Sequence, residues 1–390
     1  MSLTAADFVW LPDYQLHVAA TLAHVDQTVD RVVRLVHDYT AHDGPLSLEN
    51  VADGDRAHVV VSTVAPLPEA ITRRVADALT QLRAALEHTV YAEAENGLGR
   101  PLAAEEARSI EMPAATTSAD FDKWLNHGRR RLLPPLQQGA PLAERIRTLQ
   151  PFQRRVPDEH PLELLVEYTN LAKHRMPAVA AARLGAVYPD TPHPGLAVSQ
   201  PLERRPQPGS GRPLAAGDVI ATGPRGAYIP ISIMTTVSLQ RPHTKVWNIA
   251  VKELEYLADW VRTTAVPILI TGNRDVTPLP PQLDIETGHH DLRNELPRSG
   301  TMNAAERGAQ RIQAAVGRTS LVEVLAPLVG GDMSDTISAW VSTLNDDAVR
   351  ERVRDLIRAG ARPQDTVRAT DQLLDGIRAY EARCHESDGG

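Results

Sequence analysis

Residues 14–40 read YQLHVAATLAHVDQTVDRVVRLVHDYT, and this stretch decides the fold class of the 390-residue chain. Its apolar residues recur at spacings of four and three, at Val18, Leu22, Val25, Val29, Val32 and Val36. This spacing puts them on one stripe of an α-helix, and such a stripe is buried only when another element packs along it. The stretch therefore predicts a helix over residues 14–40 that belongs to a helical bundle.

A second apolar stripe predicts the packing partner over residues 69–95. Its members are Val75, Leu79, Leu82, Leu86 and Val90. Helical spacing, capping residues and prolines also predict a helix that starts at Ser118, and helices at 142–149, 161–175, 244–266 and 303–385. Helices therefore dominate the predicted fold.

Two stretches have the character of β-strands. Residues 57–65 are rich in β-branched side chains, and residues 227–239 place apolar side chains at alternate positions. Pro230 falls on the opposite face of the second stretch and indicates an edge strand. We expect Val219, Ile220 and Ala221 to form its hairpin partner.

These patterns predict a mainly α fold, with a helical bundle core, a small antiparallel β-hairpin or sheet insertion and a C-terminal helical module. We expect the core domain to span residues 1–270, with the β insertion at 178–240. The stretch 271–302 holds several prolines and glycines and is predicted to be a linker. The helical module is then expected at 303–390.

Composition limits the classes of function. The net charge is −8, which argues against a protein that binds nucleic acid over a broad basic surface. The single cysteine, Cys384, allows no disulfide within one chain, so we expect a reducing cytoplasm. No apolar run approaches the roughly 18 residues of a membrane span, so we expect no membrane partner.

The first polar motif, RAALEH at residues 83–88, lies on the predicted 69–95 helix. Arg83 and Glu87 are four residues apart and neighbours on the helix surface. Five residues advance by about 500° at 3.6 residues per turn, so His88 lies about 140° from Arg83 around the axis. The two side chains can therefore act together only if a second surface covers this side of the helix.

The second polar motif, NLAKHR at residues 170–175, lies on the predicted 161–175 helix. Glu163, Glu167, Asn170 and His174 follow each other at spacings of four, three and four, which makes a continuous polar face. If this face covers the first motif, histidines, cations and carboxylates meet in one groove. Such a set can transfer protons at a phosphodiester and stabilise its developing charge.

The stretch LRAALEH at 82–88 resembles the LRSALDHL signature of a widespread bacterial family. In that family a long helix and a short strand precede the signature. Segments like LQPF at 149–152, PL at 161–162 and a motif of the form N-x-D-K-H-R follow it. The chain has NLAKHR in the place of that last motif, with Ala172 where the family has an acidic residue, and the resemblance covers roughly residues 15–265.

The Arg-x4-His spacing is also similar to the motif of HEPN-type ribonucleases, although Ala84 replaces the polar residue that usually follows the arginine. These ribonucleases are small helical bundles, often dimeric. They cut RNA without a metal and often act in toxin–antitoxin or antiphage systems. The resemblance implies that Arg83 stabilises the transition state and that His88 is the general acid or base.

The leading hypothesis is therefore a HEPN-like, metal-independent endoribonuclease that acts as a toxin or antiphage effector. Its expected catalytic residues are Arg83, Glu87, His88, Asn170 and His174. Its expected substrate-binding residues are Lys173, Arg175, Arg129 and Arg130, although a run of arginines is more often a solvated face.

A non-catalytic scaffold or interaction protein remains the alternative, with the polar motifs fixing the packing of the bundle. A small-ligand sensor that uses the groove as an anion pocket is the third hypothesis. We expect no cofactor and no metal, because the metal-ligand types at 284–291 lie in a stretch with no rigid scaffold. RNA, a partner protein bound by the C-terminal module, and a second copy of the chain are the expected partners.

Overall fold

The structure is a computed structural model that describes residues 3–41, 44–128, 130–174, 178–199, 212–329, 334–360 and 363–388. The chain divides into two compact units, Met1–Ala305 and Glu306–Gly390. The fold is mainly α with two small antiparallel sheets, as the sequence predicts.

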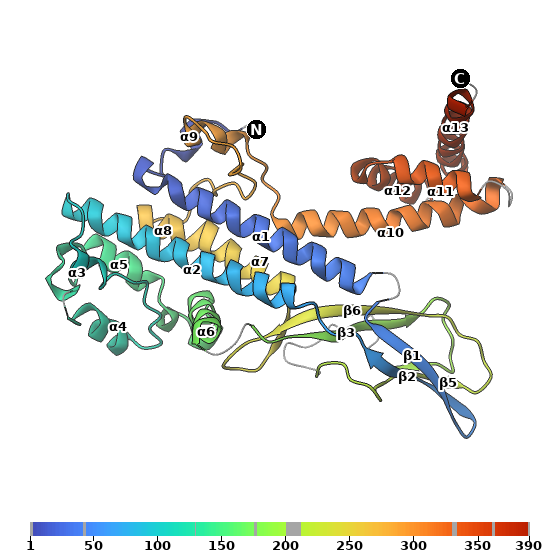
Figure 1. Cartoon of the computed structure of the whole chain (residues 1–390), viewed down its shortest axis with the longest axis horizontal. Helices are drawn as coiled ribbons and strands as arrows, with labels where there is room; N and C mark the ends of the chain where they lie inside the picture. Colours follow the sequence, from blue (N-terminus) through green and yellow to red (C-terminus); the bar gives the residue numbers. More distant parts are fainter. Residues whose placement is uncertain are drawn as a thin grey trace. The chain divides into compact units, whose positions relative to one another are not determined.

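Three long helical elements run side by side in the first unit (Figure 1). They are α1 (Leu16–Thr40), α2 (Glu69–Leu98) and the pair α7 (Ala250–Trp260) and α8 (Val266–Thr271). The predicted stripes of α1 and α2 face each other in one apolar core, where Leu22, Val25, Leu82 and Leu86 are fully buried. The lengthwise packing that the spacing predicts is therefore confirmed.

The helix predicted at 244–266 has different bounds in the structure. Residues 247–249 form strand β7, so the helix begins at Ala250 instead of near residue 244. A π-helical segment, Val261–Ala265, joins α7 to α8. It ends two residues before Pro267, which has no backbone N–H to donate, and a wider turn tolerates that loss. Gly272, with a φ of 78°, ends the element in the left-handed conformation that favours glycine.

Shorter helices pack around the long ones. They are α3 (Ala104–Ala107), α4 (Ser118–Leu125), α5 (Pro141–Thr148), α6 (Pro161–His174) and α9 (Leu292–Glu295). Among them, α6 packs directly against α2, which brings the two helices with polar motifs together. The α2 helix continues through Gly97 to Leu98 and ends at Gly99, whose φ is 66°.

The strands form two antiparallel sheets. The first has the order β1-β2-β5-β4, with β1 (Leu46–Asp53), β2 (Arg56–Val64), β5 (Val219–Pro224) and β4 (Ala197–Val198). The second has the order β3-β6-β7, with β3 (Ala180–Pro189), β6 (Ile231–Gln240) and β7 (Trp247–Ile249). Val61, Val187 and Ile220 bury their side chains in one small core that the two sheets share.

The predicted hairpin is wrong. Residues 219–221 do not pair with the 231–240 strand, because β5 pairs with β2 and β4. The main partner of β6 is β3, and β7 adds a short pairing at residues 238–240. Pro230 lies just before β6, which is the middle strand and not an edge strand in the sheet order. The predicted β insertion thus extends back to residues 46–64 of the chain.

The predicted linker at 271–302 belongs to the first unit and packs on its core. Leu279, Leu283 and Leu296 bury their side chains in that core. The Trp10 indole donates a hydrogen bond to the Thr277 carbonyl, 3.0 Å from Nε1 to O. Proline and glycine indicate irregular backbone, but the leucines between them supply apolar area that anchors the segment. The segment is therefore not a free linker.

The second unit is helical. It contains most of α10 (Ala304–Val329), then α11 (Ser334–Thr343), α12 (Asp346–Ala359) and α13 (Pro363–Asp388). These helices share a core around Leu321, Leu325, Ile337 and Trp340. Within the described part of the chain, no helix combines the length and apolar character that a membrane crossing requires.

Candidate functional site

Arg83 connects the two helices that carry the polar motifs. Its Nε donates to Glu87 Oε1 at 2.8 Å, and its Nη1 donates to Thr169 Oγ1 of α6 at 3.4 Å. The Arg83 side chain is only 15% exposed. Arg83 thus contacts α6 through one donor, and Thr169, which accepts from it, is not one of the residues of the predicted polar face.

His88 points away from that contact. Its exposed imidazole faces His17 of α1, and the two ring centroids lie 6.0 Å apart with an angle of 51° between the ring planes. The structure thus separates Arg83 from His88, as the 140° offset along the helix indicates. The ring that lies beside His88 comes from α1, and not from the polar face of α6.

The two histidines open into a pocket of about 420 Å³ between α1 and α2. Its described lining residues are Tyr14, His17, His88, Tyr91, Ala92, Glu95 and Asn96. The five residues from α2 are spaced three, one, three and one apart, which is one face of a helix. The pocket is therefore built by a second polar face of α2, separate from the face that Arg83 occupies.

Burial lowers the pKa of His17, and the nearby imidazole of His88 lowers it further. Two imidazoles at this distance disfavour double protonation, because like charges repel. Burial and the Glu95 carboxylate raise the pKa of Tyr91. The pocket therefore favours a neutral His17 imidazole and a protonated Tyr91 phenol.

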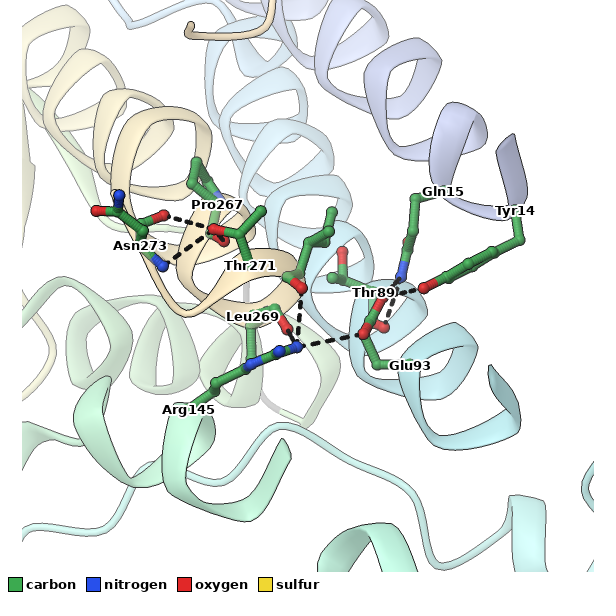
Figure 2. A network of polar contacts seen from close by, with 10 residues as sticks. Tyr14, Gln15, Thr89, Glu93, Arg145, Pro267, Leu269, Thr271 and Asn273 are labelled. Atoms are coloured by element: carbon green, nitrogen blue, oxygen red, sulfur yellow. Dashed lines mark hydrogen bonds and ion pairs between the residues drawn. The ribbon is translucent and has the colours of Figure 1, made fainter. Parts of the chain in front are cut away.

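A network of polar contacts joins the start of α1 to α2 and α8 next to the pocket (Figure 2). Glu93 of α2 is its centre. Glu93 Oε1 accepts hydrogen bonds from Tyr14 Oη and from Gln15 Nε2, both at 2.9 Å. On the other side, Arg145 Nη1 lies 3.5 Å from Glu93 Oε2 and donates to the carbonyls of Leu269 and Ile270.

This network holds the start of α1 against α2. Burial and the hydrogen bond to Glu93 raise the pKa of Tyr14 to about 12, so its hydroxyl stays a donor. Gln15 also donates to the Thr89 carbonyl at 3.1 Å. Because Tyr14 and Gln15 immediately precede the first turn of α1, these contacts fix where His17 stands in the pocket.

The predicted polar face of α6 meets a different partner. Glu163 Oε1 and Glu167 Oε1 lie 3.7 Å and 3.1 Å from Nε2 of His243, which belongs to the turn between β6 and β7. Burial raises the pKa of Glu163, and the neighbouring Glu167 carboxylate raises it further. His243 was not among the predicted site residues, because nothing in its local sequence indicates that it lies over α6.

The remaining predicted residues are not brought together with His88. Asn170 and Lys173 are exposed on α6. Arg130 is buried, so it does not present a phosphate-binding surface: its Nε and Nη1 donate to the Ser109 and Trp124 carbonyls, and its guanidinium stacks over the Trp124 ring. Arg129, Arg175 and the side chain of His174 lie outside the described residues.

Sequence reasoning missed His17, Tyr14, Tyr91, Glu95 and Asn96. A local signal existed in the helical spacing from His88 to Asn96, which marks a polar face with two ring side chains. His17 carried no such signal, since only the register between α1 and α2 shows that it lies opposite His88.

The assembled pocket can perform acid–base chemistry on a ligand of moderate size. Histidine is the side chain best suited to proton transfer near neutral pH. Aromatic rings and an amide beside it can hold a planar polar group. Comparisons with protein-family models, with curated proteins and with solved structures found no match for this chain. Its function is therefore inferred from the chemistry of its own residues.

Proposed function

We propose that the chain is a metal-independent endoribonuclease whose acid–base pair is His17 and His88. The observation that carries the proposal is the 6.0 Å separation of their ring centroids in an accessible pocket. RNA cleavage without a metal needs one group to accept a proton from the 2′-hydroxyl and another to protonate the leaving 5′-oxygen. Two facing imidazoles supply both groups.

In the proposed reaction, neutral His17 removes the proton of the 2′-hydroxyl. The resulting oxygen attacks phosphorus, the bond from phosphorus to the 5′-oxygen breaks, and protonated His88 gives its proton to that oxygen. The products are a 2′,3′-cyclic phosphate and a 5′-hydroxyl. The lowered pKa of His17 favours its role as the base, because a neutral imidazole accepts the proton.

The other pocket residues support a nucleotide as the occupant. Tyr14 and Tyr91 provide aromatic rings on which a base can stack, and the Asn96 amide can bond to a base edge. A pocket of about 420 Å³ is within the usual range for small ligands. None of its described lining residues is Lys or Arg, so recognition of a single unpaired nucleotide is proposed instead of binding along a backbone.

Arg83 has a different part in this proposal from the one that the HEPN resemblance implies. Its Nε bonds Glu87 of its own helix, its Nη1 bonds Thr169 of α6, and the described pocket lining does not include it. Arg83 and Glu87 are therefore proposed as residues that stabilise the bundle. His88 keeps its role in proton transfer.

The test is cleavage of short, fluorescently labelled single-stranded RNAs by the full chain in buffer with EDTA. We expect His17→Ala and His88→Ala each to lower the rate by about 10²–10⁴-fold. His24→Ala is the matched control, since His24 is an exposed histidine on the same helix, and it should leave the rate unchanged. Detection of the 2′,3′-cyclic phosphate supports the mechanism. Equal rates for wild type and both pocket variants would refute it.

The toxin or antiphage role rests on this activity. If the proposal holds, expression of the wild-type chain in a bacterial host slows growth or limits phage replication, and expression of the His88→Ala variant at the same level does not. An equal effect from both chains would separate any such role from the pocket.

A second candidate function is a non-catalytic interaction protein that assembles through its C-terminal unit. The observation that favours it is a set of exposed apolar side chains on one half of α10: Ile312, Val316, Val324 and Leu328 are each at least 45% exposed. Exposed apolar side chains gathered on one side of a helix are typical of a protein contact, and a second copy of the chain is the occupant that we propose. Light scattering should give a dimer mass for wild type and a monomer mass for Val316→Asp.

A further inference from the structure

Two carboxylates of α6 and one histidine from a distant part of the chain come together in the fold. Glu163 and Glu167 are four residues apart on the helix and therefore on the same face. His243 reaches them from the turn between β6 and β7, with Nε2 at 3.1 Å from Glu167 Oε1. One ligand atom from each residue lies within 4.8 Å of the other two.

The burial of Glu163 is costly without a cation. The residue is only 8% exposed, and the nearest polar partner that the structure gives its carboxylate is His243, with Oε1 3.7 Å from Nε2. The Glu167 carboxylate lies beside it, and Asp158 adds a further negative charge nearby. Removing the Glu163 carboxylate from water is unfavourable without compensation, and the like charge of the partly exposed Glu167 carboxylate adds repulsion.

We propose that Glu163, Glu167 and His243 bind one first-row divalent metal ion, such as Zn²⁺ or Mn²⁺. Such an ion has bonds of about 2.0–2.2 Å to carboxylate oxygen and imidazole nitrogen, so its ligand atoms lie roughly 3–4.4 Å apart. The spread of 4.8 Å requires only a small convergence of flexible side chains. The site goes beyond the proposed nuclease, because it lies outside the α1–α2 pocket.

The donor set discriminates among metals. Imidazole nitrogen is a good ligand for zinc and a poor one for Mg²⁺, whose preferred ligands are all oxygen. Affinity at mixed nitrogen and oxygen sites is greater for Zn²⁺ than for Mn²⁺. We therefore expect the order Zn²⁺, then Mn²⁺, then Mg²⁺. Three protein ligands leave the remaining positions to water.

A bound ion would join two elements that the local sequence does not link. Glu163 and Glu167 stand on α6, which packs against α2, whereas His243 stands on the turn after β6. The metal would tie the β3-β6-β7 sheet to the helical core. Its expected effect is a more stable turn at residues 241–246, which protease cleavage within the turn reports directly.

The experiment uses the full chain after dialysis against EDTA and titrates ZnCl₂, MnCl₂ and MgCl₂ by calorimetry. We expect one Zn²⁺ per chain, with the dissociation constant raised at least tenfold by Glu167→Gln and by His243→Ala. The control variants Glu144→Gln and His290→Ala replace exposed residues of the same types and should leave it unchanged. Circular dichroism checks that each variant is folded.

Protease cleavage is a second readout, which distinguishes zinc bound at this site from zinc bound weakly elsewhere on the chain. Zn²⁺ should slow protease cleavage in the 241–246 turn of wild type and of both controls, but not of His243→Ala. The proposal is overturned if wild type binds no Zn²⁺, or if His243→Ala binds it as tightly as wild type. In either case the three residues form a polar cluster that holds no metal. Neither result bears on RNA cleavage, which is assayed in EDTA.

Discussion

The imidazole rings of His17 and His88 face each other from α1 and α2, with centroids 6.0 Å apart and planes inclined by 51°. Each ring lies beside the apolar seam that packs the two helices together, so the pair depends on the register of that seam. The relationship places two titrating groups where the protonation of one disfavours the protonation of the other.

The first prediction concerns the titration of His17. Burial and His88 both lower its pKa, so replacing His88 by Ala should raise the pKa of His17 toward the ordinary value without reaching it. NMR titration of imidazole resonances in wild type and in His88→Ala measures the change. If cleavage uses His17 as the base, kcat/KM falls as the pH drops through this lowered pKa. An unchanged His17 pKa in the variant would contradict the coupling.

The second prediction concerns salt. Because no described lining residue of the pocket is Lys or Arg, few counterions should be released when RNA binds. With about one phosphate contact, kcat/KM should fall by less than about threefold between 50 and 200 mM salt. Asn96→Lys, which adds a cation at the pocket, should steepen the slope. A steep wild-type slope would point to a basic binding surface elsewhere on the chain.

The third prediction is that Arg83 contributes to stability, whereas His88 contributes to cleavage. Arg83→Ala removes the bonds to Glu87 and Thr169 and should lower the free energy of unfolding by about 1–3 kcal/mol. The cleavage rate per folded molecule should stay within about threefold of wild type, because Arg83 is not among the described residues that line the pocket and acts on packing. Urea unfolding and kcat measure the two effects. A loss of kcat as large as that expected for His88→Ala would show that Arg83 takes part in catalysis.

The fourth prediction concerns the polar network around Glu93, which holds the start of α1 against α2. Glu93→Gln replaces a carboxylate that accepts from Tyr14 and Gln15 with an amide that cannot accept from all the donors around it. We expect a loss of about 1–3 kcal/mol in the free energy of unfolding. A slower cleavage rate should accompany it, because Tyr14 no longer fixes the start of α1. Glu49→Gln, at an exposed glutamate of β1, is the control and should change neither quantity.

The helices could be predicted from the sequence because their signals are local. The stripe from Val18 to Val36 defines α1 to within two residues at its start. By contrast, β1 exposes nearly all of its residues and carries no buried alternating face, so nothing marks it as a strand. The pairing of β2 with β5 joins segments far apart in the chain, and local periodicity contains no information about such pairings.

The candidate site, like the fold, could be predicted from the sequence only in its local features. The polar character of residues 83–88 and of the α6 face is visible in the sequence, because helical spacing assigns residues to faces. The partners of those faces are not visible. His17 reaches His88 only through the register of α1 on α2, and His243 reaches Glu167 only because the β6–β7 turn lies over α6. Tertiary packing, and not the motif, decides which groups meet.

The last prediction is that the free energy of unfolding decreases as the pH falls, because His160 is buried in its neutral form. This residue is 4% exposed, its Nδ1 accepts a hydrogen bond from the Leu162 backbone N–H at the start of α6, and its ring meets the Trp260 ring edge-on. Burial, with a smaller contribution from Arg154, lowers its pKa from 6.5 to about 4. The folded chain therefore holds His160 neutral at a pH where the unfolded chain protonates it.

The sign follows from proton counting. Between pH 6.5 and 4 the unfolded state binds more protons at this residue, so the free energy of unfolding decreases as the pH falls through that window. The stabilisation is fully present above pH 6.5, and up to about 3 kcal/mol of it is lost by pH 4, at roughly 1.4 kcal/mol per pKa unit.

Urea unfolding of wild type and His160→Gln at pH 7, 6 and 5 measures this loss of stability. The wild type should lose more stability over this range than the variant, since glutamine does not titrate and its amide oxygen can still accept from the Leu162 N–H. Equal losses in the two proteins would show that His160 titrates alike in the folded and unfolded chains.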